Sequence, residues 1–247
     1  MIISSLNNDH IKEINKLKEK KYRDLTGTFL IEGEHLVSEA IKENLIKELF
    51  VLVGNKIYYD SVPITFVSIE VMKKLSNMES VPDIIGVCYK KKEKEIKGNV
   101  LILDDIQDPG NLGTIIRSAL AFSVDTIVLS PKTVDLYNSK VIRSTQGMLF
   151  HINIIVMDLK KVISELKEKD YMIYGTKVDG GRCAREINNV SKYALVIGNE
   201  GNGMSDDVSK LCDDYLYIEM NDKVESLNAA VAASILLYEL GGKNGIN

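Results

Sequence analysis

The second half of the chain alternates between short apolar runs and longer amphipathic stretches. The apolar runs are typical of strands and lie at residues 99–106, 125–130, 152–157, 171–178, 193–199 and 214–220. Their cores, such as LIL, TIVL, NIIV and ALVI, are apolar throughout, as in strands covered by helices on both faces. The intervening stretches predict helices at residues 112–122, 136–146, 158–169, 205–212 and 226–240. This alternation predicts an α/β domain built on a parallel sheet.

The first part of the chain shows a shorter version of the same alternation. It predicts helices at residues 8–23, 34–44 and 70–76, and strands at residues 26–33, 48–54, 64–69 and 83–89. These elements indicate a small α/β domain over residues 1–90. Residues 91–98 have no apolar periodicity and are interpreted as a linker, so the larger domain spans residues 99–247.

Charge is informative only locally. The 247 residues carry a formal net charge of −4, which gives no general indication of a nucleic-acid partner. Residues 10–23, however, hold six basic and two acidic side chains, and KKKEKEIK at 90–97 is a second basic cluster. Each cluster taken alone is also explained by solvated helix or linker charge. A polyanion-binding protein needs only such local positive charge.

The remaining composition narrows the class of protein. Three cysteines and three histidines are scattered without a zinc or disulfide spacing, so we expect no metal site and a reducing compartment. No stretch has the pattern of a signal peptide or a membrane span, and we expect a cytoplasmic protein with no membrane partner.

Three polar turns follow apolar strands, at DPGNLGTIIRSA (108–119), LVIGNEGNGMS (195–205) and YIEMNDKVESLNAAVAA (217–233). Ligands bind at the carboxyl ends of the strands in open α/β sheets. Three such turns therefore predict one composite pocket.

The first two turns argue against the common nucleotide motifs. Gly110 and Gly113 do not form the G-x-G-x-x-G fingerprint of dinucleotide sites. In the second turn, Met204 follows Gly203 where a P-loop needs lysine, and Glu200 would repel phosphate. Glu200 suits a cationic or hydroxyl-rich ligand instead.

Cap residues are expected where the helices begin. Asn111 is predicted as the N-cap of the helix after the first turn, and Ser226 as that of the last helix. Arg117 lies on the first of these helices, where a surface salt bridge is the plainer interpretation. The last helix is apolar nearly all round, which predicts burial at a subunit interface.

Together the three turns resemble the three motifs of the SpoU (TrmH-type) RNA ribose 2′-O-methyltransferases of the SPOUT superfamily. The matching stretches are NLGTIIR, IGNEGNGMS and IEM…ESLNAAVAA, in order, within residues 99–240. The stretch at 21–40 resembles the substrate-binding domain often fused to this family, although SVPDIIG (80–86) stands where relatives often carry a Gln-Gly pair.

The resemblance implies a carboxyl-terminal trefoil knot, a homodimer and S-adenosylmethionine as cofactor. By motif, the cofactor would lie against Gly198, Ile218, Met220, Leu227 and Thr176. The residues implied for catalysis are Asn111, Arg117, Glu200, Ser226 and Asn228.

The implied reaction is attack of a ribose 2′-hydroxyl on the sulfonium methyl group. Arg117 has been assigned in this family as the activating group, but a guanidinium is almost never deprotonated in proteins. We therefore expect Arg117 to hold a phosphate and offset charge on the attacking oxygen. Glu200 would brace Arg117 or Asn111.

The implied substrate is RNA, with 23S-type ribosomal RNA favoured over transfer RNA because of the front domain. The residues expected to contact its backbone are Lys18, Lys20, Lys21 and Arg23, together with the 90–97 cluster. The alternatives are a transfer RNA methyltransferase, a non-catalytic RNA-binding protein on the same scaffold, and a nicotinamide-dependent oxidoreductase, which lacks its glycine fingerprint.

Overall fold

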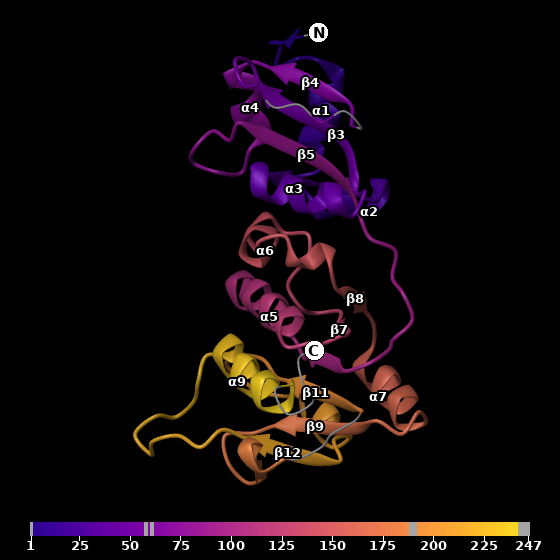
Figure 1. Ribbon diagram of the computed structural model, residues 1–247, viewed down its shortest axis with the longest axis vertical. Coiled ribbons are helices and arrows are strands. Elements are labelled where there is room, and N and C mark those ends of the chain that lie inside the picture. The colour runs from indigo at the N-terminus through magenta and orange to yellow at the C-terminus, as the bar shows by residue number, and fades with distance from the viewer. Residues whose placement is uncertain (1, 57–58, 60–61, 188–191, 242–247) are drawn as a thin grey trace. The chain divides into compact units, whose positions relative to one another are not determined.

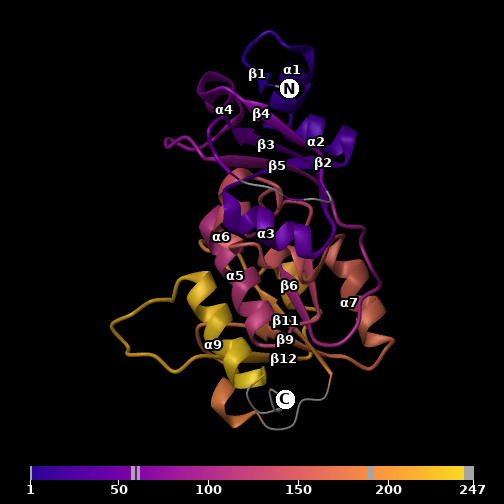
Figure 2. The ribbon, with the colours of Figure 1, turned by 45° about the horizontal axis from the view of Figure 1, so that its top comes forward.

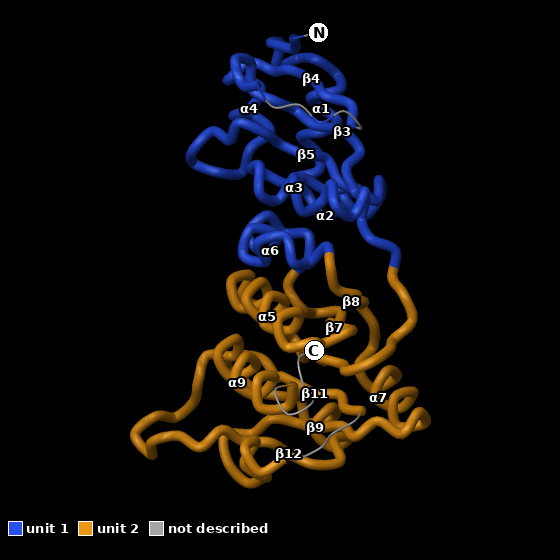
Figure 3. The backbone as a smooth tube through the Cα atoms, in the orientation of Figure 1, with its two compact units in different colours: residues 1–92, 135–150 blue, residues 93–134, 151–247 orange. Residues whose placement is uncertain are grey.

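The computed structural model describes residues 2–56, 59, 62–187 and 192–241. Figures 1 and 2 show its helices and strands in two orientations. The chain divides into two compact units (Figure 3), and each is described separately. Unit 1 comprises residues 1–92 and 135–150, and unit 2 comprises residues 93–134 and 151–247.

Unit 1 contains a five-stranded mixed sheet in the order β1-β4-β3-β5-β2. The strands are β1 (Ile2–Ile3), β2 (Thr28–Glu32), β3 (Ile46–Leu52), β4 (Ile64–Val67) and β5 (Ile84–Tyr89). The first three strands in that order are parallel, whereas β5 pairs antiparallel with both β3 and β2. The helices are α1 (Asp9–Lys16), α2 (Lys20–Thr26), α3 (Glu34–Lys42), α4 (Ile69–Leu75) and α6 (Ser139–Thr145).

The single helix predicted over residues 8–23 is wrong, because the structure has two helices there, α1 and α2. Between them the guanidinium of Arg23 donates hydrogen bonds to the carbonyl oxygens of Leu17 (2.9 Å) and Lys18 (2.7 Å). A carbonyl directed at a side chain does not accept the regular helical hydrogen bond. A side-chain contact from five to six residues further along the chain therefore accompanies the end of the first helix, and helical periodicity does not reveal it.

Residues 135–150 pack in unit 1, although the predicted boundary assigned them to the larger domain. The ring of Phe29 in β2 lies 4.5 Å from that of Tyr137 and 6.4 Å from that of Phe150, between centroids. Gly147 approaches Glu39 of α3 so closely that an added Cβ would lie 2.7 Å from its Cγ. These contacts are between residues more than a hundred positions apart, beyond the reach of local pattern.

Unit 2 contains a seven-stranded sheet in the order β10-β12-β9-β11-β6-β7-β8, and every recorded strand pair is parallel. The strands are β6 (Val100–Leu103), β7 (Thr126–Leu129), β8 (Asn153–Val156), β9 (Met172–Thr176), β10 (Arg182–Cys183), β11 (Tyr193–Ile197) and β12 (Asp214–Tyr217). The helices are α5 (Pro109–Ala121), α7 (Leu159–Lys167), α8 (Asp206–Ser209) and α9 (Ala229–Gly241). Short 3₁₀ turns occur at Met148–Phe150, in unit 1, and Ala184–Glu186, in unit 2.

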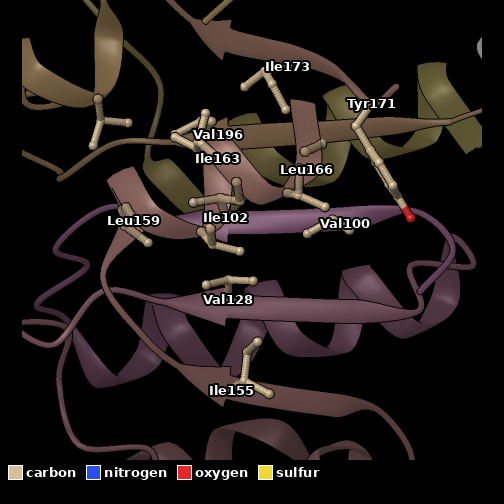
Figure 4. Close-up of a cluster of buried hydrophobic side chains, with 13 residues drawn as sticks. Val100, Ile102, Val128, Ile155, Leu159, Ile163, Leu166, Tyr171, Ile173 and Val196 are labelled. Atoms are coloured by element: carbon tan, nitrogen blue, oxygen red, sulfur yellow. The ribbon is translucent and has the colours of Figure 1, made fainter. Parts of the chain in front are cut away.

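Helices cover both faces of the unit 2 sheet, as the all-apolar strands predicted. Val100, Ile102 and Val196 point to one face and pack against Leu159 and Ile163 of α7 (Figure 4). The alternate residues of the same strands are also buried and point to the other face, where α5 and α9 pack against each other. Within the described residues, no helix is both long and apolar enough to span a membrane.

We predict that Tyr193→Phe leaves the stability of the protein unchanged or raises it by about 1 kcal/mol. The Tyr193 ring is fully buried in β11, and its hydroxyl has no hydrogen-bond partner among the described residues. Burial, with the nearby charge of Asp125, raises the pKa of this hydroxyl to about 12. Removing an unpaired buried hydroxyl relieves a desolvation cost.

Tyr215→Phe is the matched control for this substitution. The Tyr215 hydroxyl donates to the carbonyl oxygen of Ser209 at 2.6 Å, so its removal should lower the free energy of unfolding by about 1 kcal/mol. Urea unfolding of both variants measures the difference. Equal losses in the two variants would show that the hydroxyl of Tyr193 is in fact satisfied.

Candidate functional site

The three predicted turns all leave the same edge of the unit 2 sheet. Because the strands are parallel, the carboxyl ends of β6, β9, β11 and β12 lie together at this edge. Asp104 follows β6, Gly198 follows β11 and Ile218 follows β12, while Thr176 is the last residue of β9. The second and third turns line one pocket with the end of β9, as predicted, but the first turn does not line it and is joined to it through hydrogen bonds to Glu200 and Asn199.

The pocket is a cavity of about 480 Å³ in unit 2. This volume lies within the range of about 300–1,000 Å³ common for small-molecule sites. All five residues proposed from the sequence for the cofactor line the cavity, namely Thr176, Gly198, Ile218, Met220 and Leu227. Its wall is apolar on the side of β12 and α9 and rich in backbone amides along residues 197–204.

Gly198 is required by the fold of the glycine-rich turn. Asn199 and Gly203 pair through two backbone hydrogen bonds of 2.9 Å, which close the turn back onto the end of β11. A Cβ atom on Gly198 would lie 2.2 Å from both the carbonyl carbon of Gly203 and the backbone nitrogen of Met204. No side chain fits between these backbone segments.

The second turn is tied to the first by two side chains. Asn199 donates from Nδ2 to the carbonyl oxygen of Asp105 at 2.7 Å. The carboxylate of Glu200 accepts from the backbone N–H groups of Gln107 and Asp108, both at 3.2 Å, and from Nδ2 of Asn111 at 3.0 Å. Burial raises the pKa of Glu200, but these hydrogen bonds outweigh it and the net shift is downward. Glu200 is therefore held as an anion.

Asn111 connects all three turns. Its Nδ2 donates to Glu200 of the second turn, and its Oδ1 accepts from Nδ2 of Asn228 in the third turn at 2.9 Å. The expectation that Asn111 caps the helix is wrong. Asp108 is the N-cap of α5, and its side chain accepts from the backbone N–H of Asn111 at 2.8 Å. The cap at Asp108 leaves the Asn111 amide free to join the turns.

The last helix is also capped by a different residue from the one predicted. Helix α9 begins at Ala229, and Oδ1 of Asn228 accepts from the backbone N–H groups of Ala230 (2.9 Å) and Val231 (3.3 Å). Ser226 is not the cap and lines the cavity instead. Serine and asparagine are both good N-caps, so sequence alone does not choose between them.

Arg117 is exposed on α5 and is not braced by Glu200, which binds Asn111 instead. Among the described residues it has no hydrogen bond or ion pair, so the surface salt bridge considered from the sequence is absent. Arg117 does not line the cavity, whereas Glu200 and Ser226 do. A guanidinium with all its donors unused is available to an anionic substrate.

The residues expected to contact RNA backbone lie in unit 1 and differ in availability. Arg23 is only 7% exposed and donates to Leu17, Lys18 and Asp135, so the expected surface contact is wrong for this residue. Lys18 donates to two backbone carbonyl oxygens, and Lys20 pairs with Asp24 at 2.9 Å. Lys21 lies over the Tyr22 ring, with its Nζ 5.6 Å from the centroid.

Sequence reasoning missed Asp105 as a positioning residue. Asp105 has a φ of +58°, and its side chain accepts from the hydroxyl of the buried Ser130 at 2.6 Å. This left-handed conformation turns its carbonyl toward Asn199. The Asp-Asp pair after an apolar strand was a usable signal, since aspartate tolerates positive φ better than most residues.

We predict that Glu200→Gln lowers the rate of the reaction at this site by about tenfold, because charge-assisted hydrogen bonds to Asn111 and the backbone are lost. The variant should also lack the part of the acid-induced loss of folding stability that Glu200 causes in the wild type. The folded-state pKa of Glu200 is depressed, so its stabilising contribution is present above about pH 4.3 and lost as the pH falls below that value. Urea unfolding of the two proteins between pH 3 and pH 7, about the span of this titration, measures it. Parallel profiles for both proteins would contradict this account.

Comparison with known proteins connects both units to one family. Residues 98–238 match the SpoU rRNA Methylase family, and residues 8–86 match the MRM3-like substrate binding domain. The 23S rRNA (guanosine(2553)-2′-O)-methyltransferase RlmP of Bacillus subtilis is 40% identical over 245 residues, covering 97% of this chain and 99% of that protein. A putative TrmH family tRNA/rRNA methyltransferase of Staphylococcus saprophyticus is 33% identical, covering 83% of this chain and 86% of that protein.

Comparison with solved structures leads to the same group of proteins. An RNA 2′-O ribose methyltransferase superposes with a TM-score of 0.85 at 27% identity, covering 99% of both chains. An AdoMet-bound rRNA methyltransferase from Sinorhizobium meliloti gives 0.85 at 26% identity, covering 97% of this chain and 96% of that one. The expected α/β class, S-adenosylmethionine as cofactor and RNA ribose methyl transfer as activity are confirmed. The chain thus belongs to the SpoU rRNA methylase family.

Proposed function

We propose that this protein methylates a ribose 2′-hydroxyl of 23S ribosomal RNA. The observation that carries the proposal is the match to the 23S rRNA methyltransferase of B. subtilis, which covers 97% of this chain and therefore both units. A transfer RNA enzyme on this scaffold would share the larger domain but has no such full-length support here. Action on ribosomal RNA implies a cytoplasmic protein.

The 480 Å³ cavity has the chemistry to hold S-adenosylmethionine. Backbone groups along the Gly198 turn suit hydrogen bonds to adenine and to the methionine end. Ile218, Met220 and Leu227 provide an apolar wall, and the carboxylates of Glu200 and Asp206 favour a sulfonium cation over an anion. When bound, the cofactor supplies an electrophilic methyl group.

Arg117 and Asn111 are proposed to place the attacking ribose. The exposed Arg117 guanidinium binds a backbone phosphate through its planar fork and offsets negative charge that grows on the 2′-oxygen. Asn111, locked between Glu200 and Asn228, keeps the three turns in one arrangement. Orientation of the hydroxyl in a dry site is a large part of the barrier reduction.

A homodimer through α9 completes the proposal. Val231 and Tyr238 of α9, a helix that is apolar over most of its length, are 47% and 59% exposed. The Tyr238 ring packs edge-on against Phe122 at 5.7 Å between centroids. A second copy would cover this surface. The family matches at 8–86 and 98–238 support a sequence division into domains at residues 1–90 and 99–247, joined by 91–98, with residues 135–150 of the second packing in unit 1. The trefoil knot stays a prediction from the family.

The test is methyl transfer from radiolabelled S-adenosylmethionine to purified 23S rRNA and to bulk transfer RNA. We expect label in 23S rRNA alone, at one ribose that is unmethylated in cells lacking the protein. Label in transfer RNA would support the transfer RNA alternative, and binding without transfer would support the non-catalytic one.

A further inference from the structure

The glycine-rich second turn is held to the carboxyl end of β6 at two points. Near the start of the turn, Asn199 donates to the carbonyl oxygen of Asp105 at 2.7 Å. At the end of the turn, Ser205 donates to the carboxylate of Asp104, the first residue after β6. The contact at Asp104 has no part in the function proposed above.

One oxygen of Asp104 accepts both hydrogen-bond donors of Ser205. Oδ2 lies 2.7 Å from the backbone nitrogen and 2.8 Å from the hydroxyl oxygen of Ser205. Ser205 is the N-cap residue of α8, but its side chain makes no capping hydrogen bond and donates to Asp104 instead. A serine at this position usually satisfies the first turn of its helix. The contact with Asp104 therefore forms at the expense of the cap of α8.

Asp104 is a buried carboxylate without a cation beside it. It is 4% exposed and makes no ion pair within the described part of the chain. Its backbone N–H donates to the carbonyl oxygen of Ile197 at 2.9 Å, which continues the pairing of β6 with β11 and fixes the residue at the sheet edge. Taking a carboxylate out of water is costly, and apolar residues in its place are often as stable or more stable. Stability of the fold therefore does not account for this charge.

Ser205 lies between two residues that line the cofactor cavity. Met204 precedes it and Asp206 follows it, and both belong to the cavity wall, whereas neither Ser205 nor Asp104 does. Asp104 thus acts on the cavity through Ser205, whose position fixes the backbone on either side. A wall that is held in place before the ligand enters does not have to be ordered on binding, which raises the affinity.

We propose that Asp104 is a positioning residue for S-adenosylmethionine, which holds the end of the second turn through Ser205 and so preorganises the cavity wall. The inference rests on the proposed function, because it takes this cavity as the cofactor site. Since Asp104 does not line the cavity, it acts on affinity for the cofactor and not on the transfer step.

Asp104→Asn tests the role of the carboxylate. Asparagine has nearly the same shape and can still accept from Ser205, but the hydrogen bonds lose their assistance by charge. Calorimetry should show about tenfold weaker binding of S-adenosylmethionine. The demethylated product, S-adenosylhomocysteine, should lose affinity by the same factor, because a displaced wall weakens both ligands. A loss confined to S-adenosylmethionine would mean that the carboxylate acts directly on the sulfonium charge, which would overturn the positioning role.

Ser205→Ala tests the other partner of the contact. Ser205 is exposed, so this change should leave the fold intact. It removes one of the two hydrogen bonds to Asp104, and the affinity for S-adenosylmethionine should fall by about threefold. The double variant with Asp104→Asn should lose less than the product of the two separate losses, because both changes act on one contact. Losses that multiply in full would contradict a shared contact.

Val162→Ala controls for a general loss of stability. Val162 is fully buried in α7 and does not line the cavity, so its truncation destabilises the fold but should leave the affinity for both ligands unchanged. In steady-state assays, Asp104→Asn should raise KM for S-adenosylmethionine and keep kcat close to the wild-type value. A lower kcat with an unchanged KM would place the effect in the reacting groups and overturn the proposal.

Comparison with Gly198→Ala separates this inference from the proposed function. Loss of cofactor affinity in Gly198→Ala but not in Asp104→Asn would overturn the role of Asp104 and retain the cavity as the cofactor site. Unchanged affinity in both variants would overturn the cavity assignment and the inference with it. A wild-type protein that binds S-adenosylmethionine without methylating 23S rRNA would refute the proposed substrate, and the calorimetric comparison would still decide the role of Asp104.

Discussion

Arg117→Ala is expected to lower kcat for methyl transfer by about 10²–10³-fold, the usual cost of removing a group that stabilises a developing oxyanion. The guanidinium is exposed on α5 and has no partner among the described residues, so its loss breaks no hydrogen bond or ion pair described in the fold. Binding of S-adenosylmethionine should be unchanged, because Arg117 does not line the cavity. Single-turnover transfer and calorimetry separate the two effects.

Arg117→Lys discriminates between charge and geometry. Lysine keeps the positive charge but lacks the planar fork that holds a phosphate with two parallel hydrogen bonds. We therefore expect partial recovery of charge stabilisation but a rate still well below that of the wild type. Full transfer by Arg117→Ala would remove this residue from the mechanism, and full transfer by Arg117→Lys would show that charge alone suffices.

Gly198→Ala should abolish detectable binding of S-adenosylmethionine and, with it, activity. The new Cβ would lie 2.2 Å from two backbone atoms, Gly203 C and Met204 N, neither of which can rotate away as a side chain would. The turn must therefore open, which displaces the backbone amides that line the cavity and weakens the link from Asn199 to Asp105. Calorimetric titration with the cofactor measures the loss.

Gly201→Ala provides the control within the same turn. A Cβ on Gly201 would meet only the side-chain oxygen of Asn199 at 3.6 Å, an ordinary contact. This variant should bind the cofactor within about threefold of the wild type, since it disturbs no hydrogen-bond partner. If the two alanine variants lost affinity equally, close backbone packing at Gly198 would not be the cause.

The site was predictable to the extent that it is encoded locally. Each turn follows an apolar strand, and parallel strands place their carboxyl ends at one edge, so the meeting of Gly198, Ile218 and Thr176 at one cavity follows from pattern and topology. The hydrogen-bond partners within the site were harder to predict from the sequence. Glu200 had two candidate partners, and only the structure shows that it binds Asn111.

The incorrect predictions share one physical origin. The packing of residues 135–150 in unit 1 depends on contacts of Phe29 and Arg23 with residues more than a hundred positions away. The break between α1 and α2 depends on side-chain hydrogen bonds of Arg23 to carbonyl groups six and five residues before it. Periodicity reports which face of a helix is apolar, and it does not report what that face packs against. Arg23 appeared as one more surface cation for the same reason.

The amide of Asn111 has consequences for how the protein is made. Its two partners are separated from it by 89 and 117 positions, at Glu200 and Asn228. Contacts this remote form late, because long loops must close before they contribute. During synthesis, residues up to Asn228 must leave the ribosome before these contacts can form. A nascent polypeptide that ends before Asn228 should therefore be unable to transfer the methyl group.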